Sequence, residues 1–277
     1  MKMHRLLISA AHKSSGKTTV SIGLAAVLRE RGLVVQPYKK GPDYIDPLWL
    51  SAAAGRACRN LDPYLSPLDE VRATFQQGAR GADVALVEGN KGLYDGLAID
   101  GSNSNAAVAA ALDLPVVLVL DARGMTRGIA PLILGYQAFD RSLRFAGVIL
   151  NRLGGARHEA KLRAVIEHYT DVAVLGALQE DAGPVIEERH LGLLPATEAD
   201  GADERIGALA RAVQAGVDID RLLALTTCEA VPVAVEPARI QVTEPLRIGI
   251  ARDRAFGLYY AEDLDGLQRA GAQRSSA

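Results

Sequence analysis

Apolar residues occur along this chain in short continuous runs, which alternate with longer stretches in which they recur every three or four positions. Short runs are typical of strands buried on both faces of a sheet, and the longer spacing is typical of amphipathic helices. The runs predict strands at residues 5–10, 34–39, 83–89, 115–121, 145–152 and 172–177, and the spacing predicts helices after the first run and at residues 106–112, 158–169, 202–213 and 219–225. The alternation predicts an α/β fold with a doubly wound, mostly parallel sheet.

The first run leads into the segment Ser-Ala-Ala-His-Lys-Ser-Ser-Gly-Lys-Thr-Thr at residues 9–19. Its end satisfies the phosphate-binding pattern GxxxxGK[ST], while Ala11 takes the place of the first glycine. In such a loop the backbone N–H groups hold phosphate oxygens, the lysine reaches the β- and γ-phosphates, and the next hydroxyl ligates magnesium. The residues predicted to bind ATP are Ser14, Ser15, Gly16, Lys17, Thr18 and Thr19. The alternative, a Ser/Gly turn before an ordinary helix, does not explain the sequence Gly-Lys-Thr-Thr.

Carboxylates follow the second and third predicted strands. Asp43 and Asp46 stand in a turn-rich segment after the second strand, and Glu88 ends the third. Because the carboxyl ends of parallel strands share one edge of the sheet, Asp43 and Glu88 are predicted to support the Mg²⁺ that accompanies the nucleotide. Asp46 has an alternative role as the cap of the next helix, and many strands end in Glu, so these predictions depend on the phosphate loop.

Other polar residues are predicted at the same edge. Asp95 stands in the glycine-rich segment 89–96, whose tight backbone could approach a substrate. Asn151 ends a later strand, where P-loop proteins often recognise the base of the nucleotide. Arg123 could clamp a carboxylate or phosphate, although a solvated arginine is the commoner outcome. His190 lies in an unusual Glu-Glu-Arg-His-Leu run, and a structural role is the alternative to a role in the site.

Composition narrows the classes of protein that fit. With 49% hydrophobic residues, 23% charged residues and a net charge of −2, the chain has the composition of a globular protein and gives no electrostatic reason to expect nucleic acid or an anionic membrane as a partner. Its longest apolar region, residues 106–120, is broken by Asp113 and Pro115 and cannot span a bilayer. Cys58 and Cys228 form no CxxC pair, so neither a zinc site nor a disulfide framework is expected, and a cytoplasmic location is predicted.

The pattern breaks after residue 226. Residues 227–245 contain three prolines in an extended, valine-rich stretch, which predicts a linker. A strand is predicted at residues 246–251 and a helix at residues 262–270. Because one βα unit cannot bury its own faces, we expect residues 246–277 to be an incomplete start of a further domain. Residues 1–226 are expected to form the nucleotide-binding domain.

Several motifs agree on one family. The loop SSGKTT, the segments KKGPDYID and VEGNKGLYDG, the run RHLGL and the tail RIGIARDRAFGLYY resemble blocks of the cobyrinic or hydrogenobyrinic acid a,c-diamide synthases. The chain also resembles the wider dethiobiotin-synthetase-like group of P-loop amidoligases. The resemblance covers essentially the whole chain. It implies a domain that uses ATP and Mg²⁺ to activate carboxylates of a tetrapyrrole acid through an acyl phosphate, and a C-terminal glutaminase domain that supplies ammonia.

The resemblance also implies roles for individual residues. Lys17 and Thr18 would hold phosphate and magnesium, and Asp43 and Glu88 would serve magnesium or phosphoryl transfer. The residues that would bear on the substrate are Tyr44, Asp46, Leu93, Tyr94, Asp95 and His190. The catalytic group implied in this way is Lys17, Asp43, Asp46, Glu88 and Asp95.

Two departures from the family's pattern limit these expectations. The family's glutaminase carries a nucleophilic Cys and a general-base His, and neither Cys58 nor Cys228 lies in that domain, so we expect no glutaminase activity and a need for ammonia or a separate glutaminase domain. The segment EGNKGLYDG more closely resembles the corresponding segment of relatives that amidate sirohaem. The choice between a corrinoid and sirohaem is therefore left open, as is a homodimer.

Two other functions remain as alternatives. A non-catalytic nucleotide switch of the partitioning-ATPase kind shares the fold, but that class places a lysine one residue after the loop's first glycine, where this chain has His12. The second alternative is an inactive remnant that does not fold stably.

Overall fold

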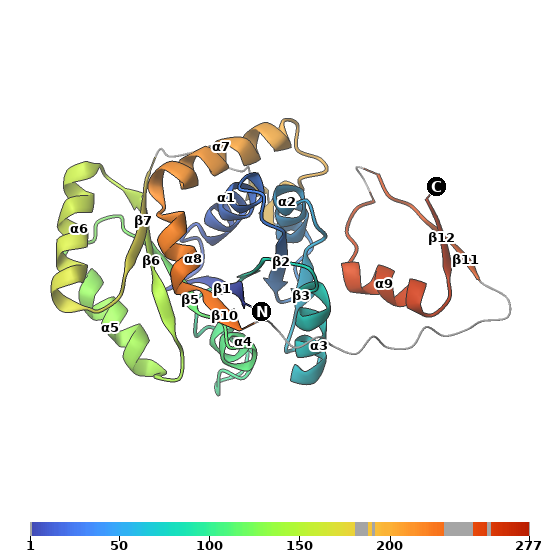
Figure 1. The fold of residues 1–277 in the computed structure, drawn as a ribbon, viewed down its shortest axis with the longest axis horizontal. Coiled ribbons are helices and arrows are strands. Elements are labelled where there is room, and N and C mark those ends of the chain that lie inside the picture. The colour runs from blue at the N-terminus through green and yellow to red at the C-terminus, as the bar shows by residue number, and fades with distance from the viewer. Residues whose placement is uncertain (1, 181–187, 190–191, 230–245, 254–255, 277) are drawn as a thin grey trace.

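The structure, a computed structural model, describes residues 2–180, 188–189, 192–229, 246–253 and 256–276. Its centre is an eight-stranded sheet with the order β3-β2-β4-β1-β5-β6-β7, in which β10 pairs with β1 outside this path (Figure 1). The seven strands of the path are parallel: β1 Lys2–Ala10, β2 Val35–Lys40, β3 Arg59–Leu61, β4 Val84–Glu88, β5 Val116–Asp121, β6 Phe145–Leu153 and β7 Val174–Gln179. The prediction of a doubly wound, mostly parallel sheet is confirmed.

Helices cover both faces of this sheet. One face packs against α1 Lys17–Glu30, α2 Ile45–Ala54, α7 Ala202–Gly216 and α8 Ile219–Leu225. The other packs against α3 Leu68–Gly78, α4 Asn105–Leu112, α5 Ile129–Phe139 and α6 Ala156–Tyr169. All five residues of the interior strand β4 are buried, which is why its sequence is a continuous run rather than an alternation.

The phosphate-loop helix α1 lies under α7. At Gly23, a Cβ would stand 2.8 Å from the Leu209 carbonyl oxygen and 2.5 Å from Val213 Cγ2. Glycine is therefore required at this crossing, because any side chain would push the two helices apart. The close packing fixes α1, and with it the loop at its N-terminus.

Three differences from the sequence-based prediction stand out in the large sheet. β1 begins at Lys2 rather than residue 5, and β3 at Arg59–Leu61 lies in a stretch that the pattern left unassigned. The third is β10, Thr227–Glu229, which falls inside the predicted linker but pairs antiparallel with the start of β1. The sheet thus uses residues beyond 226, and the rest of the predicted linker lies outside the described residues.

The C-terminal residues form a small βαβ unit of β11 Arg247–Ile250, α9 Ala261–Arg269 and β12 Gln273–Ser276. The strand and helix follow the predicted positions, and β12 was not predicted. The Arg59 guanidinium on β3 pairs with Glu262 and Asp265 of α9 at 3.3 and 2.7 Å. The Tyr260 ring stacks on Tyr44 with centroids 4.2 Å apart, so this unit contacts the larger domain next to α2.

A short pair of strands lies between β7 and α7 in the sequence. Strands β8, Glu188–Arg189, and β9, Gly192–Leu193, form an antiparallel pair. Among the described residues, no helix is both long and apolar enough to cross a membrane.

Candidate functional site

The phosphate loop joins the end of β1 to the first turn of α1. Its backbone takes left-handed conformations at Ser14, with φ 60°, and at Gly16, with φ 92°. A Cβ at position 16 would lie 2.1 Å from Nδ2 of Asn151, so glycine is required both by the backbone and by this neighbour. Lys17, the first residue of α1, is 7% exposed. The loop therefore places the lysine at the helix N-terminus, where the helix dipole and free N–H groups favour an anion.

Two residues at the end of β6 hold the carbonyl groups of this loop. Nδ2 of Asn151 donates to the Ser15 carbonyl at 2.9 Å, and the Arg152 guanidinium donates to the Ser14 carbonyl at 2.7 Å. Arg152 also contacts Asp121 Oδ2 at 2.8 Å, at the end of β5. Because the Asn151 and Arg152 side chains bind two of its carbonyl groups, the loop can turn its N–H groups towards a phosphate. Asn151 thus lies against the predicted nucleotide loop, and contact with the base stays a prediction.

The Asp121 carboxylate is ionised and pairs with two arginines, Arg123 and Arg152. Burial alone would raise its pKa, but hydrogen bonds from Arg123 and Arg152 outweigh this and hold the pKa of the Asp121 carboxyl at about 2. Arg123 pairs with Asp121 at 2.7 Å. The structure therefore does not show Arg123 as a clamp for ligand anions. Its guanidinium instead pairs with Asp121 at the end of β5.

The carboxylates predicted from the sequence meet at the adjacent edge. The Thr18 hydroxyl donates to Glu88 Oε1 at 2.6 Å and lies 3.3 Å from Asp46 Oδ2. Lys39, which the sequence-based prediction missed, is paired with Glu88 in the β2–β4 register. Its Nζ lies 2.5 Å from Asp46 Oδ2, 2.8 Å from Glu88 Oε1 and 3.7 Å from Asp43 Oδ2. The strand register thus makes one ion-pair cluster from residues that are far apart in the sequence.

Burial decides much of the electrostatics of this cluster. It raises the pKa of the Glu88 carboxyl, against the charge and hydrogen bond of Lys39, and raises the pKa of Asp43. Burial would lower the pKa of Lys39, but the charges of Glu88 and Asp46 more than reverse this, so its pKa is raised and it stays an ammonium. Burial lowers the pKa of the Lys17 ammonium, against the charge of Glu88. The cluster is an environment in which an added cation or a phosphate changes the charge balance strongly.

Two features of the cluster bear on magnesium. Glu88 is fully buried, and its Oε2 has no hydrogen-bond partner among the described residues. The described residues contain no group of three or more His, Cys, Asp or Glu that could hold a metal by itself. The Thr18 hydroxyl and the Glu88 carboxylate therefore fit Mg²⁺ only as part of a ligand set that phosphate oxygens and water complete, which is how P-loop sites bind it.

Asp43 precedes Tyr44, the N-cap residue of α2, and its side chain holds the first turn of that helix. Its Oδ1 accepts hydrogen bonds from the backbone N–H groups of Ile45 and Asp46 at 2.9 and 3.1 Å. The alternative interpretation of Asp46 as the cap is therefore wrong, and Asp46 faces Lys39 and Thr18 instead. Because Oδ2 of Asp43 faces Lys39, the residue joins the start of α2 to the ion-pair cluster.

The segment after β4 is a tight loop held by buried Asn105. Nδ2 of Asn105 donates to the carbonyls of Asn90 and Gly92 at 2.6 and 2.8 Å, and its Oδ1 accepts from the Asn90 N–H. A Cβ at Gly92 would lie 2.6 Å from the Ala11 carbonyl oxygen, so this loop lies directly against the phosphate loop. Asp95 is exposed, and its Oδ2 accepts from the Gly92 N–H at 2.9 Å.

The same loop corrects one predicted substrate contact. Leu93 is 0% exposed and packs in the hydrophobic core, because its N–H bonds to the Ala10 carbonyl and turns its side chain inward. It therefore supports the loop and presents no side chain to a ligand. The Tyr94 hydroxyl donates to the Tyr136 carbonyl at 2.5 Å and is half-buried. Of Leu93, Tyr94 and Asp95, it is Asp95 whose side chain the loop exposes.

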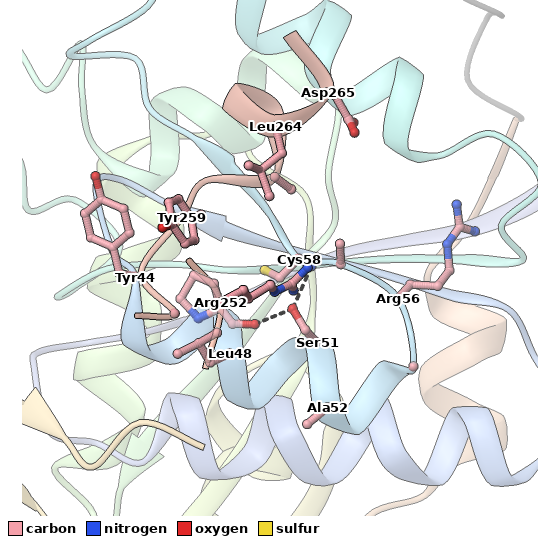
Figure 2. Close-up of a pocket in the computed structure, with 15 residues that line it drawn as sticks. Tyr44, Leu48, Ser51, Ala52, Arg56, Cys58, Arg252, Tyr259, Leu264 and Asp265 are labelled. Atoms are coloured by element: carbon pink, nitrogen blue, oxygen red, sulfur yellow. Dashed lines mark hydrogen bonds between the residues drawn. The ribbon is translucent and has the colours of Figure 1, made fainter. Parts of the chain in front are cut away.

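A cavity of about 530 Å³ lies beside Tyr44, between α2 and the C-terminal unit. Figure 2 shows Tyr44 and Tyr259 at one side of it and Ser51, whose hydroxyl accepts from the Cys58 N–H at 2.8 Å, at its floor. Of the predicted site residues that the structure describes, only Tyr44 lines this cavity, and Lys17, Glu88 and Asp95 do not. The cavity is thus separate from the phosphate end of the site. His190, another predicted substrate residue, lies outside the described residues.

Comparison with known proteins gives the chain's relatives. The family described as AAA domain matches residues 4–184, well over half of the chain. A protein named cobyrinate a,c-diamide synthase from Magnetococcus marinus is 45% identical, covering 98% of this chain and 60% of that protein. A second of that name, from Methanosarcina acetivorans, is 42% identical, covering 97% and 57%. Among solved structures, the signal recognition particle receptor FtsY from Elizabethkingia anophelis in complex with GDP has a TM-score of 0.47 and 16% identity, over 76% of this chain and 64% of that chain.

This chain spans about 60% of the length of the relatives that it matches along nearly all of its own residues. The phosphate loop and the buried carboxylates beside it fall within the matched family region, at residues 4–184, as do all parallel strands except the first two residues of β1. The chain therefore belongs to the AAA-domain family and is a homologue of proteins named cobyrinate a,c-diamide synthase.

Proposed function

We propose that this chain is the ATP-dependent synthetase part of an enzyme that amidates side-chain carboxylates of a tetrapyrrole acid, either cobyrinate or sirohaem. One observation carries the proposal. The sheet edge brings Lys17, the Thr18–Glu88 pair and the Asp95 loop together, in a homologue of proteins whose name states the formation of a diamide. Such an edge suits transfer of a phosphoryl group to a substrate bound between the loops.

The chemistry follows from the poor reactivity of a carboxylate. A carboxylate oxygen of the substrate attacks the γ-phosphorus of ATP, ADP leaves, and an acyl phosphate forms. Ammonia then attacks the carbonyl carbon, phosphate leaves with the C–O bonding electrons, and a proton is lost from nitrogen to give the amide. Both steps depend mainly on positioned positive charge and the exclusion of water, and no covalent enzyme intermediate is needed.

Each residue has a part in this scheme. Lys17 holds the β- and γ-phosphates and offsets the charge that develops on the leaving ADP. Thr18 and Glu88 would hold Mg²⁺, which neutralises phosphate charge when it is bound. Asp43 and Asp46 order this edge through Lys39, and exposed Asp95, next to the phosphate loop, contacts the substrate or its intermediate. Tyr44, which follows Asp43 in the chain and lines the cavity beside α2, is proposed to flank the substrate.

The source of ammonia follows from the same proposal. Neither cysteine of this chain is suited to act as a glutaminase nucleophile: Cys58 is buried, burial raises the pKa of its thiol, and Cys228 lies on β10. Free ammonia, or ammonia from a glutaminase domain, is therefore the nitrogen donor.

The test is a product assay with the purified chain. Mg²⁺, ATP and ammonium chloride are supplied with cobyrinic acid or with sirohaem, and the amides are identified by liquid chromatography and mass spectrometry. We expect amide and ADP in equal amounts, with ammonium but not with glutamine. A Lys17→Met variant should form neither, whereas Lys13→Met, which changes an exposed lysine of the same loop, should keep the activity. No amide from either macrocycle with ammonium would contradict the proposal.

A further inference from the structure

Lys39 lies at the centre of the carboxylates of the candidate site. Its side chain is 3% exposed, and the register of β2 and β4 places it directly beside Glu88. Its ammonium is 2.5 Å from Asp46 Oδ2 and 2.8 Å from Glu88 Oε1. A buried ammonium with such partners is held firmly, because its desolvation is offset only while the carboxylates stay in contact.

The Thr18 hydroxyl contacts the same two oxygen atoms. It donates to Glu88 Oε1 at 2.6 Å and lies 3.3 Å from Asp46 Oδ2. The hydroxyl after the loop lysine is the group that holds Mg²⁺ in a phosphate loop. The ammonium of Lys39 therefore contacts the same two carboxylate oxygens as the hydroxyl that would hold this cation.

The fully buried Glu88 provides an independent observation. Its second oxygen, Oε2, has no hydrogen-bond partner among the described residues. An unpartnered buried carboxylate oxygen is costly, and a further cation at this edge would satisfy it. The carboxylates of Asp43, Asp46 and Glu88 thus face positive charge from Lys39 but have capacity for more.

Two cations at this position repel each other. At separations of a few ångströms this repulsion is strong in a buried site. Oδ2 of Asp43, 3.7 Å from Nζ, offers Lys39 a carboxylate partner other than Glu88 and Asp46. The cluster therefore provides a second place for the ammonium when a divalent cation takes the first.

We propose that Lys39 is an internal counter-cation that competes with Mg²⁺ for Glu88 and Asp46. It stabilises the site before the nucleotide binds, and loading with Mg²⁺ and ATP requires its ammonium to leave these two oxygens. Lys39 is thus a positioning residue that sets how much magnesium the site needs. This inference rests on the proposed function, in that Thr18 and Glu88 are taken as the magnesium ligands.

The test measures magnesium binding without turnover. Wild type, Lys39→Met, Lys39→Arg and Lys40→Met are unfolded by heat in EDTA, and then at increasing Mg²⁺ with a fixed concentration of the non-hydrolysable analogue β,γ-imido-ATP. Lys40 is the matched control, because it is the next residue of β2 and none of the three carboxylates is within ion-pair distance of it in the described part of the chain.

We expect Lys39→Met to have a lower Tm than wild type in EDTA, because three carboxylates lose a counter-charge. The Mg²⁺ concentration for half of the rise in Tm should fall by about tenfold or more, because the competing charge is gone. Lys39→Arg and Lys40→Met should stay within about threefold of wild type. If Lys39→Met does not fold alone, Lys39→Gln, purified with Mg²⁺ and the analogue, replaces it and should show the same fall.

The outcomes separate the two proposals. A wild-type Tm that does not respond to Mg²⁺ and the analogue would contradict the proposed function itself. The second outcome is that wild type responds, but the uncharged Lys39 variants need at least as much Mg²⁺ as wild type. This outcome would overturn only the role of Lys39. That second result would mean that Lys39 assists the phosphate or the metal instead of competing with it.

Discussion

Gly16 of the phosphate loop allows a quantitative test of how the site is built. Gly16→Ala places a Cβ on a residue with φ 92°, which costs about 1–2 kcal/mol for a left-handed backbone. It also places the Cβ 2.1 Å from Nδ2 of Asn151, so that side chain must move and give up its bond to the Ser15 carbonyl, at about 0.5–1.5 kcal/mol. The free energy of unfolding should therefore fall by about 1.5–3.5 kcal/mol.

A matched glycine separates the two contributions. Gly32 has φ 82°, but a Cβ there would meet nothing within 4 Å, so Gly32→Ala should cost only the backbone term of about 1–2 kcal/mol. In the background of Asn151→Ala, Gly16→Ala should cost no more than Gly32→Ala, since the obstructing side chain and its hydrogen bond are already absent. The double-mutant cycle should thus show a favourable coupling of about 1 kcal/mol between positions 16 and 151.

Urea unfolding measures these differences. The single tryptophan, Trp49, is fully buried and donates to the Leu194 carbonyl at 2.8 Å, so its fluorescence reports loss of the fold. The reasoning fails if Gly16→Ala and Gly32→Ala cost the same, or if the costs of Gly16→Ala and Asn151→Ala simply add. Either result would mean that Asn151 does not pack against the loop as the structure shows.

Two further predictions concern the edges of the fold. The pKa of Asp121 is lowered from 3.8 to about 2, so its pairing contributes stability above about pH 4 that is lost as the pH falls towards 2. Asp121→Asn should reduce the loss of stability between pH 4 and pH 2, as measured by urea unfolding. An unchanged loss of stability over this range would contradict the pairing. Arg59→Ala removes both ion pairs to α9 and should speed protease cleavage within residues 246–276. Arg72→Ala, which removes an exposed pair with Asp69 and a hydrogen bond to the Ala111 carbonyl but no contact with α9, should not. Equal cleavage in both variants would show that the Arg59 pairs do not hold the C-terminal unit.

The fold could be predicted because its signals are local. A parallel strand covered on both faces must be apolar throughout, and β4 and β5 are visible for that reason as short runs in the sequence. β3 and β12 were missed, since short edge segments of three or four mostly polar residues carry no such run. β10 was misplaced in the linker because its pairing with β1 joins opposite ends of the domain.

The site was predictable as a set of residue types, and its internal contacts were not. The loop sequence identified Lys17 and Thr18, but the partnership of Lys39 with Glu88 depends on a strand register that no local pattern encodes. The support of the loop by Arg152 likewise depends on which strand ends lie next to it. For Leu93, the motif named the loop correctly but did not show which of its side chains turns inward.

The central claim is that the phosphate loop directs the γ-phosphate of ATP to a substrate carboxylate rather than to water. The direct measurement uses a tetrapyrrole acid labelled with ¹⁸O in its carboxylates, incubated with the chain, Mg²⁺, ATP and ammonium, followed by mass spectrometry of the released phosphate. Because one carboxylate oxygen becomes the bridging oxygen of the acyl phosphate and leaves with phosphorus, each amide formed should yield one phosphate that carries ¹⁸O. Phosphate without ¹⁸O, released in ordinary water, would show that ATP is hydrolysed without activating the carboxylate and would contradict the claim.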